Sequence, residues 1–95
     1  MVIREKIRIK YTDEGIDYVL FINKVNNGWV EVVEKANERI HKDIFRVSSV
    51  NHVKLLKDGI YIAYGSNSNV IHINVLGASK KDINNLYITL VDLMY

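Results

Sequence analysis

The chain has 95 residues, no cysteine and a net charge of +2, with 13 lysines and arginines against 11 aspartates and glutamates. This length predicts a single domain spanning residues 1–95, and a hydrophobic content of 48% argues against disorder. The absence of cysteine excludes disulfides, thiolate nucleophiles and zinc sites that need sulfur. The net charge is smaller than the basic excess of many nucleic-acid-binding proteins.

The first residues carry several charges with no apolar run behind them, which predicts that there is no signal peptide. No stretch is long and apolar enough to predict a membrane span. We therefore expect a cytoplasmic protein that does not contact a membrane. Ile, Asn, Lys and Tyr are abundant and have AT-rich codons, which favours a low-GC genome such as that of a virus or mobile element.

Residues 2–11 alternate between apolar and charged side chains, the pattern of a strand with one buried face. Glu5 is the one exception to the alternation. The expected polar face is a stripe of four cations at roughly 6.8 Å spacing: Arg4, Lys6, Arg8 and Lys10. The expected core face carries Ile3, Ile7, Ile9 and Tyr11.

The cation stripe has two interpretations. It could bind an anionic surface such as the phosphates of a nucleic acid, and Phe21 would add a stacking ring if the next strand turns it to the same face. Alternatively, it is a solvated face, or an edge strand whose lysines discourage pairing with other sheets.

Residues 16–22 are apolar on both faces, which predicts a central strand covered on both sides. The turn before it allows two registers. A four-residue turn would pair Tyr11 with Ile16, whereas a three-residue turn with a bulge at Gly15 would pair Thr12 with Ile16. In either register the four cations stay together.

Residues 28–42 are predicted to form a helix, because Trp29, Val33, Ala36 and Ile40 recur at helical spacing. The β-branched residues near its start leave a strand as the alternative for the first turn.

Residues 44–50 are predicted as a strand. The segment 50–57 fits a short helix or a strand, and a strand is favoured because Asp58-Gly59 is a hairpin signal that would pair Leu55 with Ile62. Residues 60–64 and 70–76 predict a further hairpin around the polar loop 65–69. A last helix is predicted to begin at Ser79 with a capping-box pattern.

These elements predict an α+β domain, mainly an antiparallel sheet of five to six strands with two helices, in the order β-β-α-β-β-β-β-α. This order of elements is similar to that of the roadblock and longin type of small α+β domain. The likeness is in element order alone, with no shared motif, so it implies nothing about function.

No catalytic motif, cofactor fingerprint or metal-ligand spacing is found, so no catalytic residue, cofactor or metal is predicted. Two side chains are candidate ligand contacts on a sheet face, Tyr61 and His72. A surface histidine without a ligand is the plainer interpretation of His72.

The sequence favours a small non-enzymatic interaction module that binds another protein or a copy of itself. Its large aromatic side chains exceed what a short chain readily buries, and interfaces are enriched in such rings. Nucleic-acid binding through Arg4, Lys6, Arg8 and Lys10 is the alternative. A small-ligand or enzymatic domain centred on Tyr61 and His72 is the second alternative.

Overall fold

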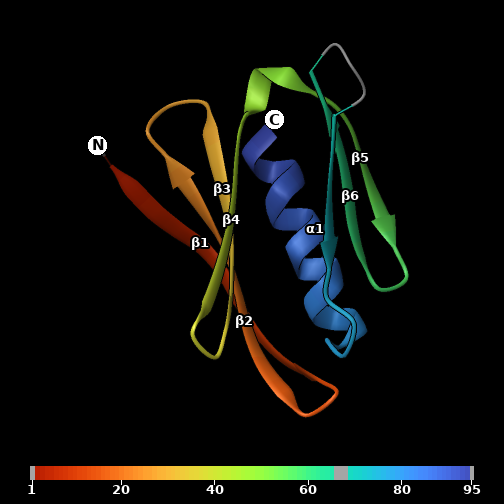
Figure 1. Ribbon diagram of the computed structural model, residues 1–95. Coiled ribbons are helices and arrows are strands. Elements are labelled where there is room, and N and C mark those ends of the chain that lie inside the picture. The colour runs from red at the N-terminus through yellow and green to blue at the C-terminus, as the bar shows by residue number, and fades with distance from the viewer. Residues whose placement is uncertain (1, 66–68, 95) are drawn as a thin grey trace.

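The computed structural model describes residues 2–65 and 69–94 (Figure 1). Two antiparallel meanders are followed by one helix. Sheet A contains β1 (Ile3–Asp13), β2 (Ile16–Val25), β3 (Trp29–Ala36) and β4 (Arg39–Arg46), in that order. After a 3-10 turn, η1 (Val47–Ser49), sheet B contains β5 (Val50–Leu56), β6 (Gly59–Tyr64) and β7 (Asn69–Asn74), and α1 (Lys80–Met94) follows. The α+β class is confirmed, whereas the expected single sheet of five to six strands with two helices is wrong.

The helix α1 lies between the two sheets (Figure 1). It contacts β1 of sheet A and β5 and β6 of sheet B, so it links the two meanders. On α1 the buried side chains are Ile83, Leu86 and Leu90, which recur at the spacing of one helical face. The rest of the buried cluster comes from both sheets and from Val75, which directly follows β7: Ile9, Tyr11, Leu20, Ile22, Val30, Val32, Phe45, Ile60, Ile62, Ile71, Ile73 and Val75.

The helix predicted for residues 28–42 is wrong, since this segment forms β3, a turn and the first half of β4. Val30, Val32 and Val33 are all buried, and β-branched side chains pack well against their neighbours on a pleated sheet. Asn37 adopts a φ of 55°, which allows the chain to reverse in a tight turn where the sequence pattern suggested a continuing helix. The likeness to roadblock and longin domains rested on that helix, so it does not hold.

The first hairpin is tighter than either predicted register. Asp13 pairs with Ile16, so only Glu14 and Gly15 form the turn. Both residues have positive φ, 50° and 78°, which is the backbone of a type I′ hairpin turn. The prediction that β2 is a central strand is confirmed, because β2 pairs with β1 on one side and β3 on the other.

The segment 50–56 is a strand, as favoured, but its hairpin has a different register. Leu55 pairs with Ile60 instead of Ile62, so Lys57 and Asp58 make the turn and Gly59 belongs to β6. A shift of two residues leaves the buried faces unchanged. The strand expected over residues 44–50 is not continuous: β4 ends at Arg46, η1 occupies Val47–Ser49, and β5 begins at Val50.

The hairpin of β6 and β7 agrees with the prediction, with Ile71, Ile73 and Val75 buried on one face. Of its polar loop, residues 66–68 lie outside the described part of the chain. The start of α1 is also confirmed, because the Ser79 hydroxyl accepts a hydrogen bond of 3.1 Å from the Asp82 backbone N–H. Among the residues described, no helix has the length and apolar character needed to cross a membrane.

Candidate functional site

A β-bulge in β1 divides the four cations of the predicted stripe. Glu5 pairs with Asn23, whereas Ile7 pairs with Ile22, so Lys6 is an extra residue in the edge strand. Beyond the bulge, Arg8 and Lys10 lie on the face of sheet A opposite the core, here called the outer face. The expectation that all four cations share one face is therefore wrong.

Arg4 lies on the other side of the sheet. It pairs with Lys24, which alternation places on the same face as the fully buried Ile22. Lys6 and Arg4 line a pocket of about 400 Å³ together with Lys24. The bulge thus creates two separate basic surfaces from one run of sequence.

The outer face of sheet A combines cations with partly exposed aromatic rings. Its two aromatic side chains are Phe21 of β2 and Trp29 of β3, both half-buried. Strand register places five cations on this face: Arg8, Lys10, Lys35, Lys42 and Arg46. The same register places three carboxylates there: Glu5, Asp17 and Glu31.

Cations of this face lie over its aromatic rings. The Arg8 guanidinium carbon is 5.1 Å from the centre of the Phe21 ring, and the Lys35 ammonium nitrogen is 5.2 Å from the same centre. The Arg46 guanidinium carbon is 5.0 Å from the centre of the Trp29 ring. Such contacts at exposed sites contribute about 0.5–1 kcal/mol, so a competing ligand can displace them at modest cost.

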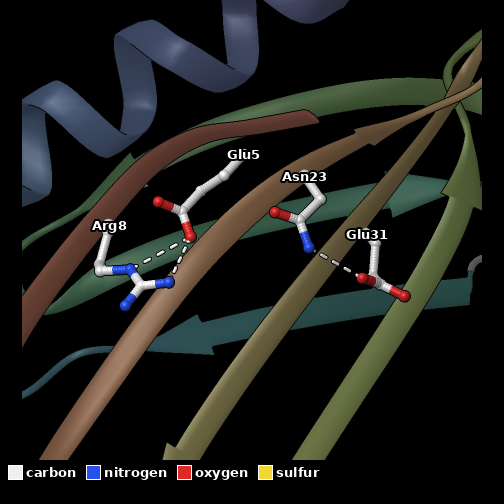
Figure 2. A network of polar contacts seen from close by, with 4 residues as sticks. All are labelled: Glu5, Arg8, Asn23 and Glu31. Carbon is white, nitrogen blue, oxygen red and sulfur yellow. Dashed lines mark hydrogen bonds and ion pairs between the residues drawn. The ribbon is translucent and has the colours of Figure 1, made fainter. Parts of the chain in front are cut away.

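All three carboxylates on this face accept hydrogen bonds: Asp17 accepts from the Thr12 hydroxyl at 2.8 Å, and Figure 2 shows the contacts of the other two. Arg8 donates to Glu5 through Nη2 at 2.6 Å and Nε at 3.1 Å. The Asn23 amide donates to Glu31 at 2.9 Å, and Asn23 is buried although it lies on the outer face. The Arg8–Glu5 pair is solvent-exposed and thus contributes little to stability.

A second candidate site is an acidic cleft of about 420 Å³ between the inner face of sheet A and β7. The Tyr11 and Tyr18 rings stack in it with centres 5.0 Å apart, and the Tyr11 hydroxyl donates to Glu34 at 2.8 Å. The pKa of Tyr11 is raised well above its ordinary value. Burial is the largest cause, followed by the hydrogen bond to Glu34 and the negative charge of the Glu34 carboxylate. Its titratable lining groups are Tyr11, Asp13, Tyr18, Glu34, His41, Asp43 and His72.

The cleft brings histidines and carboxylates together without forming a metal site. His41 Nε2 lies 3.1 Å from Asp43 Oδ2. Within residues 2–65 and 69–94, no three His, Asp or Glu side chains are grouped as metal ligands.

The two candidate ligand contacts on sheet B are cross-strand neighbours. Tyr61 of β6 pairs with His72 of β7, as expected for a shared sheet face. His72 also lines the acidic cleft, whereas Tyr61 is not among the residues that line it. The pair therefore does not form one concave site in the described part of the chain.

Sequence reasoning missed several side chains of both basic surfaces. Trp29, Lys35 and Lys42 were assigned to a helix, so their place beside Phe21 could not be seen. Lys24 was not considered because its pairing with Arg4 depends on the bulge. The one sign of the bulge in the sequence is Glu5. Its charge interrupts the alternation of apolar and charged residues in β1 one residue before Lys6, the extra residue of the bulge.

Comparison of the chain with protein-family models, with curated proteins and with solved structures found no match.

Proposed function

We propose that the protein binds single-stranded nucleic acid on the outer face of sheet A. The observation that carries this proposal is the Phe21 ring, which lies beneath two cations in the middle of a four-stranded sheet. Single-strand binding combines a basic surface that follows the phosphates with aromatic rings on which bases stack. Arg guanidinium planes also stack on bases, so Arg8 and Arg46 extend the same surface.

The spacing of the rings fits more than one base. Phe21 and Trp29 lie on neighbouring strands, and Trp29 pairs with Val25, four residues along β2 from Phe21. This separation is about 13 Å along the strand direction. The cations on β1, β3 and β4 lie around the rings, where phosphates of a strand crossing the sheet would pass.

Binding should depend steeply on salt. If all five cations contact phosphates, the logarithm of the association constant falls against the logarithm of salt concentration with a slope of about −3.5. Between 50 and 200 mM salt this slope corresponds to a loss of roughly 100-fold. Fluorescence anisotropy with a labelled unstructured oligonucleotide measures both values.

Phe21→Ala should weaken binding about 5- to 150-fold and leave the salt slope unchanged, because stacking on a ring is worth about 1–3 kcal/mol per base. Phe21→Leu keeps an apolar side chain for folding and should show a similar loss of affinity.

Arg8→Gln should instead reduce the magnitude of the salt slope by about 0.7. The matched control is Lys54→Gln, an exposed lysine on sheet B. Equal losses in Lys54→Gln and Arg8→Gln, or binding unchanged in Phe21→Ala, would refute this site.

A second candidate function is homodimerisation through β4, which with β1 is one of the two edge strands of sheet A. Ile40 and Ile44 are 60% and 53% exposed there, unusually high for large apolar side chains on one strand face. Pairing β4 with its copy about a two-fold axis would join two sheets and cover these side chains.

Sedimentation equilibrium tests the dimer directly. The chain should sediment at twice its mass of 11.0 kDa, and Ile44→Lys should return it to the monomer mass while leaving the fold intact. Ile88→Lys on α1, where the side chain is 48% exposed, is the control and should remain dimeric. A monomer of 11.0 kDa at high protein concentration would contradict the candidate.

A further inference from the structure

The pocket created by the bulge is a separate site on the opposite side of β1 and β2 from the outer face. It has a volume of about 400 Å³ and is lined by Val2, Arg4, Lys6, Lys24, Asn26 and Asn27. We propose that this pocket binds a phosphate group, held by its three cations and by side-chain amide donors. This site does not depend on the proposed nucleic-acid surface, because its residues and those of the outer face are different.

The three cations converge for a structural reason. Arg4 and Lys24 are direct partners in the antiparallel pair, which places their Cα atoms within about 5.5 Å of each other. Lys6 follows Arg4 by two residues, and the bulge at Lys6 separates both cations from Arg8 and Lys10, so Arg4 and Lys6 line the same pocket as Lys24. Three positive charges from two strands therefore surround one hollow.

This arrangement is unfavourable in the absence of an anion. Like charges directly opposite each other across a strand pair destabilise a sheet. Among the described residues, no carboxylate forms an ion pair with Arg4, Lys6 or Lys24. An anion in the pocket removes that repulsion, so its binding and the stability of the fold are linked.

The turn beside the pocket is held in a fixed shape. The Asn26 backbone N–H donates to the Val2 carbonyl at 2.8 Å, and the Val2 N–H donates to Asn26 Oδ1 at 2.9 Å. Asn26 adopts a φ of 50°, a conformation that asparagine tolerates better than most residues. The Val2 N–H can donate only to an oxygen, so the side-chain oxygen of Asn26 faces Val2 and its NH2 group remains available to donate to a ligand.

The chemistry of the lining favours a phosphate group over a carboxylate. A phosphate monoester carries close to two negative charges and three strong acceptor oxygens at neutral pH. Arg4 can bind two of these oxygens side by side, and the lysines supply point charges. The amides of Asn26 and Asn27 add neutral donors at the rim.

The test uses inorganic phosphate and the full chain. At a phosphate concentration ten times the dissociation constant, the melting temperature should rise by roughly 5–10 °C. Amide resonances of Arg4, Lys6, Lys24 and Asn26 should shift in a saturable way. Phosphate also stabilises proteins by exclusion from their surface, and that effect is the same for every variant.

Lys24→Glu distinguishes the two effects. The new carboxylate stands opposite Arg4, so the variant should melt higher than wild type without phosphate and should lose the saturable rise with phosphate. Lys54→Glu makes the same charge change on sheet B and should retain the full phosphate response. An equal phosphate response in Lys24→Glu and wild type, or no saturable shift at the pocket residues, overturns the proposal.

The phosphate could be a free ion or the end of a nucleic-acid strand, and two oligonucleotides separate these sources. Tighter binding of a 5′-phosphorylated oligonucleotide than of its unphosphorylated form, lost in Lys24→Glu, assigns the pocket to a strand end. Equal binding of the two, together with a response to inorganic phosphate, assigns it to a free phosphate. Phe21→Ala should keep the phosphate response, so failure of the outer-face proposal and failure of the pocket give different results.

Discussion

Gly59→Ala is expected to destabilise the fold by about 3 kcal/mol or more, at the upper end of the cost of overpacking a core. Gly59 is buried in β6, and a Cβ built on it would overlap the backbone carbonyl of Ile73 in the neighbouring strand β7. Backbone atoms cannot rotate away as a side chain can, so β6 and β7 would have to separate. Urea unfolding of the variant and wild type measures the loss.

The control for Gly59→Ala is a glycine with free space around it. Gly15 has a φ of 78°, and a Cβ added to it would meet no atom within 4 Å, so Gly15→Ala carries only the conformational cost of about 1–2 kcal/mol. If both variants lose the same amount, contact with β7 is not the reason that residue 59 is glycine.

Gly59 also explains why the register of its hairpin could not be predicted. Asp58-Gly59 has the composition that is typical of a two-residue hairpin turn. The structure uses Lys57 and Asp58 instead, because the close approach of β7 requires a residue without a side chain within β6. A contact with a strand that comes later in the chain decided the register, and local composition carries no information about it.

The elements with clear periodicity were predictable, and those where two patterns overlap were not. The alternation of β1, the hairpin of β6 and β7, and the apolar face of α1 each follow from sequence. In residues 28–42, apolar residues recur both at helical spacing and at every second position. The segment becomes β3 and β4 because Val30 and Val32 join the core shared with α1 and Val33 is buried on the outer face, which a sequence pattern does not reveal.

Only part of the candidate site could be predicted from the sequence, for a similar reason. Four cations in alternation implied one surface, and Phe21 was foreseen as a ring beside them if β2 turned that way. The bulge at Lys6 moved two of these cations to another face. A single extra residue changes the face of everything before it, so the exact location of a bulge decides which side chains form a site.

Leu86→Ala is expected to cost about 2–5 kcal/mol, because it removes a fully buried leucine from the helix between the sheets. The cavity would lie where α1 meets the shared core, since Leu86 belongs to the cluster that contains residues of both sheets. Thermal or urea unfolding should show a single transition at lower stability, with sheets A and B losing structure together.

Ile88→Ala is the matched control on the same helix. Ile88 lies two residues from Leu86 on the side of α1 that faces away from the core, and it is 48% exposed. Its truncation should therefore lower the free energy of unfolding by less than about 0.5 kcal/mol. The helix would otherwise change little, because alanine has the highest helix propensity. A large loss in Leu86→Ala with almost none in Ile88→Ala means that one face of α1 holds the two meanders together. Equal losses would mean that α1 is covered on both sides, by a second copy of the chain or by another partner.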